Sequence, residues 1–199
     1  MKANEVAVVL TGYQKEFCSP DGKLHALVKD MLAPYKIIEN TIDLLKRARD
    51  KKIPVFNASI VFSPGYPELE NPVGILKNIK EMKAFLKGTL GAELIDEFKP
   101  FKDYITDVEG KTGLSCFRHT NLDKLLKDRN IHTIAAAGLL TNVCVESTVR
   151  AGYDAGYEII VLKDCTACRS RSWQDYAEQN IFPMFGSVIT HDEFLSTVQ

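Results

Sequence analysis

The sequence has no long hydrophobic run and almost no excess of charge of either sign. Its 199 residues include 25 Lys and Arg and 26 Asp and Glu, for a formal net charge of −1, and no basic tract. This balance gives no electrostatic reason to expect binding to nucleic acid or to an anionic membrane. The apolar run after the first five residues is too short for a signal-peptide core or a membrane span. We therefore expect a cytoplasmic protein without nucleic-acid or membrane partners.

Patterns of metal ligands are also missing. The five cysteines are an odd number in a chain too long to depend on disulfide bonds, which fits a reducing compartment. Cys165 and Cys168 have CxxC spacing, but without a second pair a zinc or redox site is the less favoured interpretation. The histidines are scattered, and none pairs with another at metal-ligand spacing: His25, His119, His132 and His191. We expect no metal and no cofactor.

Short apolar segments do alternate with amphipathic segments along the whole chain. We expect strands near 5–10, 53–62, 104–108, 133–138, 158–162 and 187–190, and helices near 36–51, 122–127, 143–155, 173–182 and 191–195. A hydrophobic content of 45% suffices for a sizeable core in one α/β domain spanning residues 1–199. The alternation predicts a parallel sheet with helices on both faces, which makes three layers.

The segment between residues 63 and 100 is long and weakly patterned. It follows the second predicted strand, and excursions beyond the carboxyl end of a strand often shape a pocket or an oligomer contact. The alternative is an exposed loop with a short helix near 90–98. The sequence does not decide between the two.

The candidate site lies in the stretch 132–167. Its first part is a short apolar run that predicts a buried parallel strand. Thr141 and Asn142 are then expected to cap a helix over 143–155, and Gly156 is a natural residue to end it. The following strand completes a βαβ unit.

Cys144 falls in the first turn of this predicted helix. Ligands bind at the carboxyl ends of strands in α/β proteins, and Cys144 follows such an end. A helix N-terminus favours the thiolate, and its amide groups can hold an oxyanion when the sulfur attacks a carbonyl. The alternative is that Cys144 is only a small buried hydrophobic residue.

The stretch around Cys144 reads GLLTNVCVESTVRAGYDAGYEIIVLKDCTA and resembles the signature of the isochorismatase-like cysteine hydrolases. That superfamily includes isochorismatases, nicotinamidases and carbamoyl-amide hydrolases. The family's two other motifs are matched by Val8-Val9-Leu10 with Gln14 and Phe17, and by Lys111 with Ser115 and Phe117. The resemblance therefore covers nearly the whole chain.

The resemblance implies a fold and a set of site residues. The fold is a six-stranded parallel sheet in the order 3-2-1-4-5-6. In the family's Cys-Asp-Lys triad, the nucleophile corresponds to Cys144 and the lysine to Lys111, whose ammonium group would lower the thiol pKa. The family's cis peptide before the nucleophile corresponds to Leu139-Leu140, so that Leu139, Leu140 and Cys144 would form the oxyanion-binding turn.

The chain departs from the family at the catalytic acid. Gly12 stands where the family has its aspartate, in a register fixed by Gln14 and the phenylalanine after it. We expect a void of the size of the missing side chain beside Cys144. Glu16 and His119 are the possible substitutes for the acid, and without one, turnover should be severely reduced.

These features support two interpretations of function. In the first, the chain is an isochorismatase-family cysteine hydrolase that acts on a small amide or enol-ether-like substrate. In the second, it is a catalytically impaired or inactive relative that binds a small molecule or a partner protein. A metal-dependent nicotinamidase is disfavoured, because the family's metal ligands include two histidines and the segment 63–100 has none. In either case we expect a small-molecule ligand and a homo-oligomer.

Overall fold

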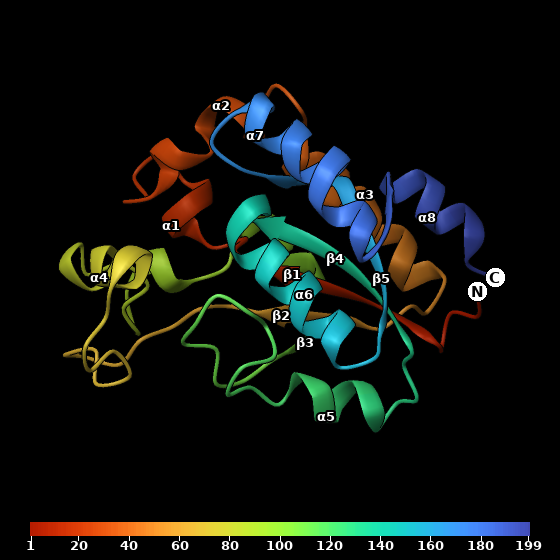
Figure 1. Ribbon diagram of the computed structural model, residues 1–199, viewed down its shortest axis with the longest axis horizontal. Helices are drawn as coiled ribbons and strands as arrows, with labels where there is room; N and C mark the ends of the chain where they lie inside the picture. The colour runs from red at the N-terminus through yellow and green to blue at the C-terminus, as the bar shows by residue number, and fades with distance from the viewer.

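The computed structural model describes residues 1–199 and contains one six-stranded sheet (Figure 1). All neighbouring strands are parallel, in the order β3-β2-β1-β4-β5-β6, which confirms the predicted topology. The strands are β1 (Val6–Thr11), β2 (Val55–Ala58), β3 (Ile105–Asp107), β4 (Thr133–Leu139), β5 (Glu158–Ala167) and β6 (Gly186–Ile189).

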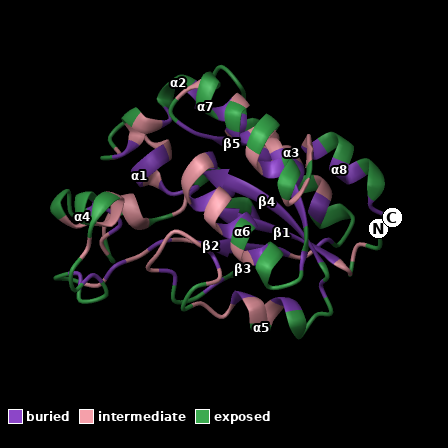
Figure 2. Ribbon diagram, viewed as in Figure 1, coloured by how far each residue is buried: buried purple, intermediate pink, exposed green.

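The central strands β1 and β4 are buried at every residue, as Figure 2 shows in purple. Successive side chains of a strand point to opposite faces of the sheet. In β1, Val6, Val8 and Leu10 accordingly join one hydrophobic cluster, while Ala7 and Val9 join the other. An uninterrupted apolar run is thus what a strand covered on both faces requires.

Helices complete the outer layers. One face of the sheet is covered by α3 (Ile37–Asp50) and α8 (His191–Thr197), whose apolar residues belong to the first cluster. The other face is covered by α5 (Leu122–Lys127) and α6 (Glu146–Asp154), with residues of the second cluster. The predicted three-layer α/β architecture is therefore confirmed.

Several predicted elements differ at their ends. β5 continues to Ala167, five residues beyond the predicted end, so that Cys165 lies inside a strand. The predicted helix at 173–182 is α7 (Arg171–Tyr176), followed by irregular helical turns to Met184. α7 begins earlier than expected because the Ser170 side chain accepts a hydrogen bond from the Trp173 amide.

The segment 63–100 contains more helix than the sequence indicated. It forms α4 (Gly74–Glu81) and short 3-10 turns at Leu90–Ala92 and Asp96–Phe101. The remaining helices are short and precede α3: α1 (Lys15–Cys18) and α2 (Lys29–Leu32). None of the helices combines the length and the apolar character needed to cross a bilayer.

Candidate functional site at Cys144

A sharp turn places Cys144 just beyond the carboxyl end of β4. The Leu139-Leu140 peptide bond is cis, as predicted. A single π-helical turn, Thr141–Val145, follows and leads directly into α6. The amides of Val143 and Val145 both donate to the Leu140 carbonyl, at 3.0 and 3.2 Å.

The predicted side-chain cap is wrong. Leu140 occupies the N-cap position, and no side chain caps the turn. Thr141 Oγ1 donates instead to Gln174 Oε1 at 2.7 Å, and Gln174 Nε2 donates to Thr166 Oγ1 at 2.9 Å. The hydroxyl that was expected to cap the helix therefore ties the turn 141–145, which carries Cys144, to β5 and α7.

Thr148 joins the turn to a second loop. Its hydroxyl donates to the Cys144 carbonyl oxygen at 2.7 Å and accepts a hydrogen bond from the Cys116 amide at 3.0 Å. Thr148 is buried, so both bonds are shielded from water. The loop that carries Lys111 is thereby fixed to the turn that carries Cys144.

Lys111 is buried, with an exposed fraction of 2%. Its Nζ donates to the carbonyl oxygens of Gly113, at 2.5 Å, and Leu114, at 2.8 Å. These carbonyl groups compensate part of the cost of burying the ammonium group. Its positive charge lowers the pKa of the Cys144 thiol, although Lys111 itself does not line the cavity beside Cys144.

Burial raises the pKa of the Cys144 thiol above its ordinary value. Lys111 opposes this effect by lowering the pKa, and a backbone hydrogen bond from Leu140 lowers it further, while Cys116 raises it. The sequence led us to expect a favoured thiolate, but the loss of hydration in a dry site outweighs the nearby cation. Nucleophilic use of Cys144 thus requires removal of a firmly held proton.

The expected void at Gly12 does not exist. Gly12 has φ of +75°, and a Cβ built on it would lie 2.3 Å from the Leu139 carbonyl oxygen. Gly138 makes the reciprocal approach, because its Cβ would lie 2.0 Å from the Thr11 carbonyl oxygen. The ends of β1 and β4 therefore meet backbone to backbone, which only glycine permits. Gly12 is not among the residues lining the cavity beside Cys144.

Neither proposed substitute for the acid reaches that cavity. Glu16 is buried, but its carboxylate packs against Gly91, where a Cβ would lie 1.5 Å from Oε2. Its Oε1 has no hydrogen-bond partner, and Lys23 Nζ lies 3.9 Å away. His119 is exposed, and neither residue lines the cavity.

The cavity beside Cys144 has a volume of about 240 Å³. Of its 15 lining residues, 13 are hydrophobic. Leu140 and Val143, from the turn that carries Cys144, form part of the wall. Residues of α4 form another part. Such a cavity can hold a small molecule but offers it few polar contacts.

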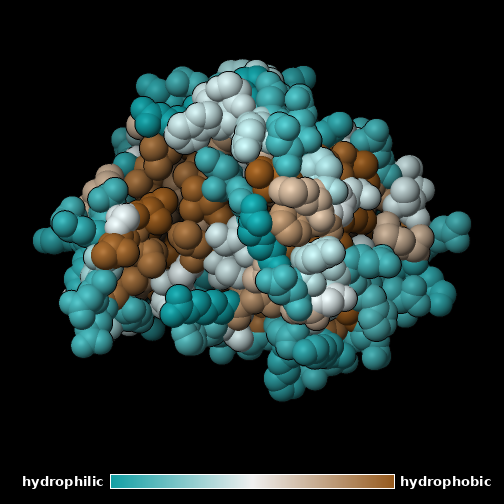
Figure 3. Space-filling model, in the orientation of Figure 1, coloured by the Kyte–Doolittle hydropathy of each residue, from teal (hydrophilic) through white to brown (hydrophobic).

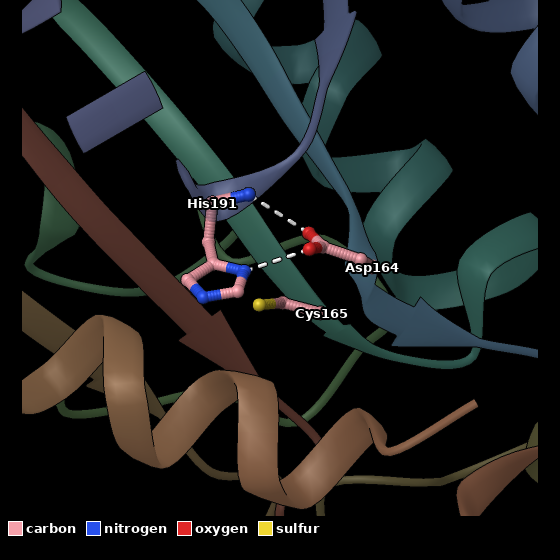
Figure 4. A group of neighbouring side chains, drawn as sticks. All are labelled: Asp164, Cys165 and His191. Carbon is pink, nitrogen blue, oxygen red and sulfur yellow. Dashed lines mark hydrogen bonds and ion pairs between the residues drawn. The ribbon is translucent and has the colours of Figure 1, made fainter. Parts of the chain in front are cut away.

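A second group of chemically active side chains lies around His191 (Figure 4). His191 Nδ1 lies 2.7 Å from Asp164 Oδ2, and Nε2 lies 3.2 Å from Asp43 Oδ2. Cys165 is enclosed beside them, and burial raises its pKa well above the ordinary value. A metal would need a free imidazole nitrogen and a thiolate. The group fits an ionic link among α3, β5 and α8 better than a metal site.

Three residues that line the cavity were missed in the sequence: Ile75, Ile79 and Met82. Their spacing of four and three residues places them on one face of a helix, which is the signal that would have identified α4 as a wall. Thr148 was also missed. Its position four residues after Cys144 is the spacing at which a hydroxyl reaches back to a carbonyl.

Comparison with known proteins identifies the family and agrees with the fold. The isochorismatase domain family matches residues 6–193. The ureidoacrylate amidohydrolase RutB of Pseudomonas savastanoi pv. phaseolicola is 31% identical over 213 aligned positions, covering 99% of this chain and 85% of that protein. RutB of Stutzerimonas stutzeri is also 31% identical, covering 98% of this chain and 83% of that protein.

Two solved structures are similar over almost the whole chain. A cysteine hydrolase from Pseudomonas syringae pv. phaseolicola has a TM-score of 0.84 and 26% identity, covering 98% of this chain and 93% of that one. An N-carbamoylsarcosine amidase from Thermoplasma acidophilum has a TM-score of 0.73 and 26% identity, covering 96% of this chain and 98% of that one.

Proposed function

Because the chain belongs to the isochorismatase domain family of hydrolases, we propose that it cleaves a small acyl substrate through Cys144, with Lys111 as the supporting cation. One observation carries the proposal. Cys144 forms part of a cavity wall while a buried lysine lowers the pKa of its thiol. Burial of Lys111 without a carboxylate partner is costly, and a developing anion beside it would offset that cost.

The reaction has two stages. The Cys144 sulfur loses its proton and attacks the acyl carbon, forming a C–S bond while the carbonyl electron pair moves to oxygen. The backbone N–H groups of Leu140 and Cys144 are the proposed donors to this oxyanion. Its collapse breaks the bond to the leaving group, which ends with the thiol proton. Water then adds to the thioester, leaving its hydroxyl on the acyl carbon and a proton on the sulfur.

The absence of a carboxylic acid should make both stages slow. Gly12 has no side chain, and the only polar residues lining the cavity besides Cys144 are Lys23 and Asn78. Each general acid or base role contributes about 10²- to 10⁴-fold. Substrates whose leaving group departs without protonation, such as activated esters, should therefore react much faster than amides.

The test is acylation of the whole protein by p-nitrophenyl acetate, followed by release of p-nitrophenolate and by intact mass. We expect one acetyl group on Cys144, and slow turnover afterwards. Ureidoacrylate, an amide and an enol ether complete the panel. Cys144→Ala should remove the acetyl group while the other four thiols remain. Acetylation that persists in this variant would refute the proposal.

A second function is favoured by the composition of the cavity. With no carboxylate or histidine in its wall, the same site suits a relative that binds a small molecule without cleaving it. Binding to the cavity without any acylation of Cys144, even by activated esters, would establish this alternative.

Three broader expectations belong to the same proposal. Residues 1–199 act as one domain, which is supported by the match over 6–193. A cytoplasmic location is supported by five cysteines that are all free. A homo-oligomer is supported by three exposed apolar residues of the segment 63–100, Val73, Met82 and Leu90, and sedimentation would determine the number of subunits.

A further inference from the structure

The wall of the Cys144 cavity indicates what kind of acyl group fits there. Its apolar lining includes Phe17, Leu24 and Phe85, together with Ile75 and Ile79 of α4 and Met82 directly after that helix. Figure 3 shows hydrophobic side chains gathered over the region between α1 and α4. The cavity therefore continues an apolar region of the surface instead of forming a polar cleft.

The one charged residue of the wall already interacts with other groups of the protein. Lys23 is the one cationic residue of the lining, and its Nζ donates to the Lys83 carbonyl oxygen at 2.6 Å and lies 3.9 Å from Glu16 Oε1. Asn78 is exposed on α4. A carboxylate placed among the hydrophobic residues of this cavity would lose hydration that Lys23 and the exposed Asn78 replace only in part, which is unfavourable.

We infer that the substrate is a neutral acyl compound whose acyl part is a medium-length aliphatic or phenyl-substituted chain. This rests on the proposed role of Cys144 as nucleophile. An apolar cavity of about 150 Å³ holds benzene, and the present cavity of about 240 Å³ admits a somewhat larger group. The substrate class thus differs from ureidoacrylate, whose name describes a ureido group and a carboxylate.

Burial of the acyl chain of the substrate determines how much the acylation rate should change. Each methylene group transferred from water into the cavity should raise the second-order rate of acylation by about fourfold. The increase should stop when the chain fills the cavity. A terminal carboxylate on a chain of equal length should reverse the gain, because the charge would have to enter the same apolar space.

The experiment uses p-nitrophenyl esters of the acetyl, butanoyl, hexanoyl and octanoyl series, with the monoester of adipic acid as the charged match for hexanoyl. Acylation releases p-nitrophenolate as the C–S bond forms and the C–O bond breaks. The burst therefore corresponds to one p-nitrophenolate for each thiol that is acylated. We expect hexanoyl to react about 10²-fold faster than acetyl and the adipate monoester to react more slowly than hexanoyl. Equal rates along the series, or a faster charged ester, would overturn the inference.

Two substitutions, one in α4 and one at the residue directly before it, sharpen the test. Ile75→Phe adds volume inside the cavity at a half-buried position and should shift the optimum to a shorter chain. Val73→Phe is the matched control, because Val73 is 81% exposed and does not line the cavity. An unchanged chain-length profile in Ile75→Phe, in a protein with an unchanged melting temperature, would contradict the inference.

The outcomes separate the two proposals. If no ester acylates Cys144, the proposed function fails, and the substrate class with it. If acetyl and charged esters acylate Cys144 as fast as hexanoyl, the nucleophile stands and only the apolar substrate class is wrong.

Discussion

Two buried cysteines at the carboxyl side of neighbouring strands, Cys144 and Cys165, have opposite surroundings. Burial raises the pKa of both thiols. The charge of Lys111 lowers the pKa of the Cys144 thiol, whereas Asp164 raises that of Cys165 further. Cys144 also lines a cavity, and Cys165 is completely enclosed.

Burial by itself disfavours the thiolate, which is the reactive form of cysteine. A usable thiol needs space for a substrate and a compensating positive charge, and only Cys144 has both. The enclosed cysteine instead belongs to a region where charges are already paired, with His191 between two carboxylates.

Exchanging each cysteine in turn gives the most direct test. Cys144→Ala should abolish acylation by p-nitrophenyl esters, because no other thiol has access to the cavity. Cys165→Ala should leave the acylation rate unchanged, since Cys165 is enclosed. Intact mass and burst kinetics measure both. Loss of acylation in Cys165→Ala, in a protein with an unaltered melting temperature, would break the comparison.

Gly12→Ala tests the backbone contact that supports the Cys144 turn. The new Cβ would meet the Leu139 carbonyl oxygen at 2.3 Å, at a residue with φ of +75°. We expect a loss of about 2 to 4 kcal/mol in the free energy of unfolding, measured in urea.

Gly65→Ala is its control, because Gly65 has φ of +84° but nothing within 4 Å of the added Cβ. It should cost about 1 kcal/mol through the backbone alone. Equal losses in the two variants would mean that the contact with Leu139 has no energetic role. For the same reason, Gly12→Asp should not restore activity.

Removing the positive charge beside Cys144 should make its thiol resemble that of Cys165. Lys111→Met keeps most of the side-chain volume and should raise the apparent pKa of Cys144, because the cation that lowers it is lost, and so slow alkylation at any fixed pH below that pKa. The measurement is the pH dependence of iodoacetamide labelling at each cysteine.

Cys18 serves as an internal reference, because its burial already raises the pKa to about 12. Lys111→Arg, which retains the charge, should behave more like the parent protein. A pH profile of Cys144 labelling that is identical in Lys111→Met would show that the charge of Lys111 does not act on the sulfur.

The smallest expected effect concerns the charged region around Cys165. The hydrogen bond with Asp164 is the main cause that raises the pKa of His191 above its usual 6.5, while burial opposes it. The protonated His191 ring therefore makes its full contribution to the free energy of unfolding below a pH of about 6.5. That contribution is lost as the pH rises through the pKa of His191 in the folded protein.

His191→Gln should accordingly destabilise the protein more at pH 6 than at pH 9, in urea denaturation at both values. His119→Gln, at an exposed position, should show no such difference. A difference in the free energy of unfolding between the parent protein and His191→Gln that is larger at pH 9 than at pH 6 would contradict the raised pKa of His191.

The sequence predicted the sheet well because its signals are local. Apolar runs such as 133–138 identify strands covered on both faces, and the motif around Cys144 implied both the strand order and the cis bond at Leu139-Leu140. The site was less predictable, because it depends on backbone geometry. Nothing in the sequence indicates that Gly12 has a positive φ and meets the Leu139 carbonyl oxygen, so the expected void was wrong.

Long-range hydrogen bonds account for the other errors. Thr141 was expected to cap a helix, but Gln174, 33 positions away, takes its hydroxyl. Glu16 was a possible acid because of its place in the chain, yet its carboxylate packs against Gly91. Such partners are decided by tertiary contacts that no local pattern contains.

The double hydrogen bond of Thr148 makes one amide hydrogen a reporter on the whole site. The Cys116 N–H donates to the same hydroxyl that holds the Cys144 carbonyl oxygen. Exchange of that hydrogen with solvent requires the loop that carries Lys111 to separate from the turn that carries Cys144. The exchange rate of this hydrogen therefore measures how often the loop of Lys111 and the turn of Cys144 move apart. An acyl group bound in the cavity should lower that rate.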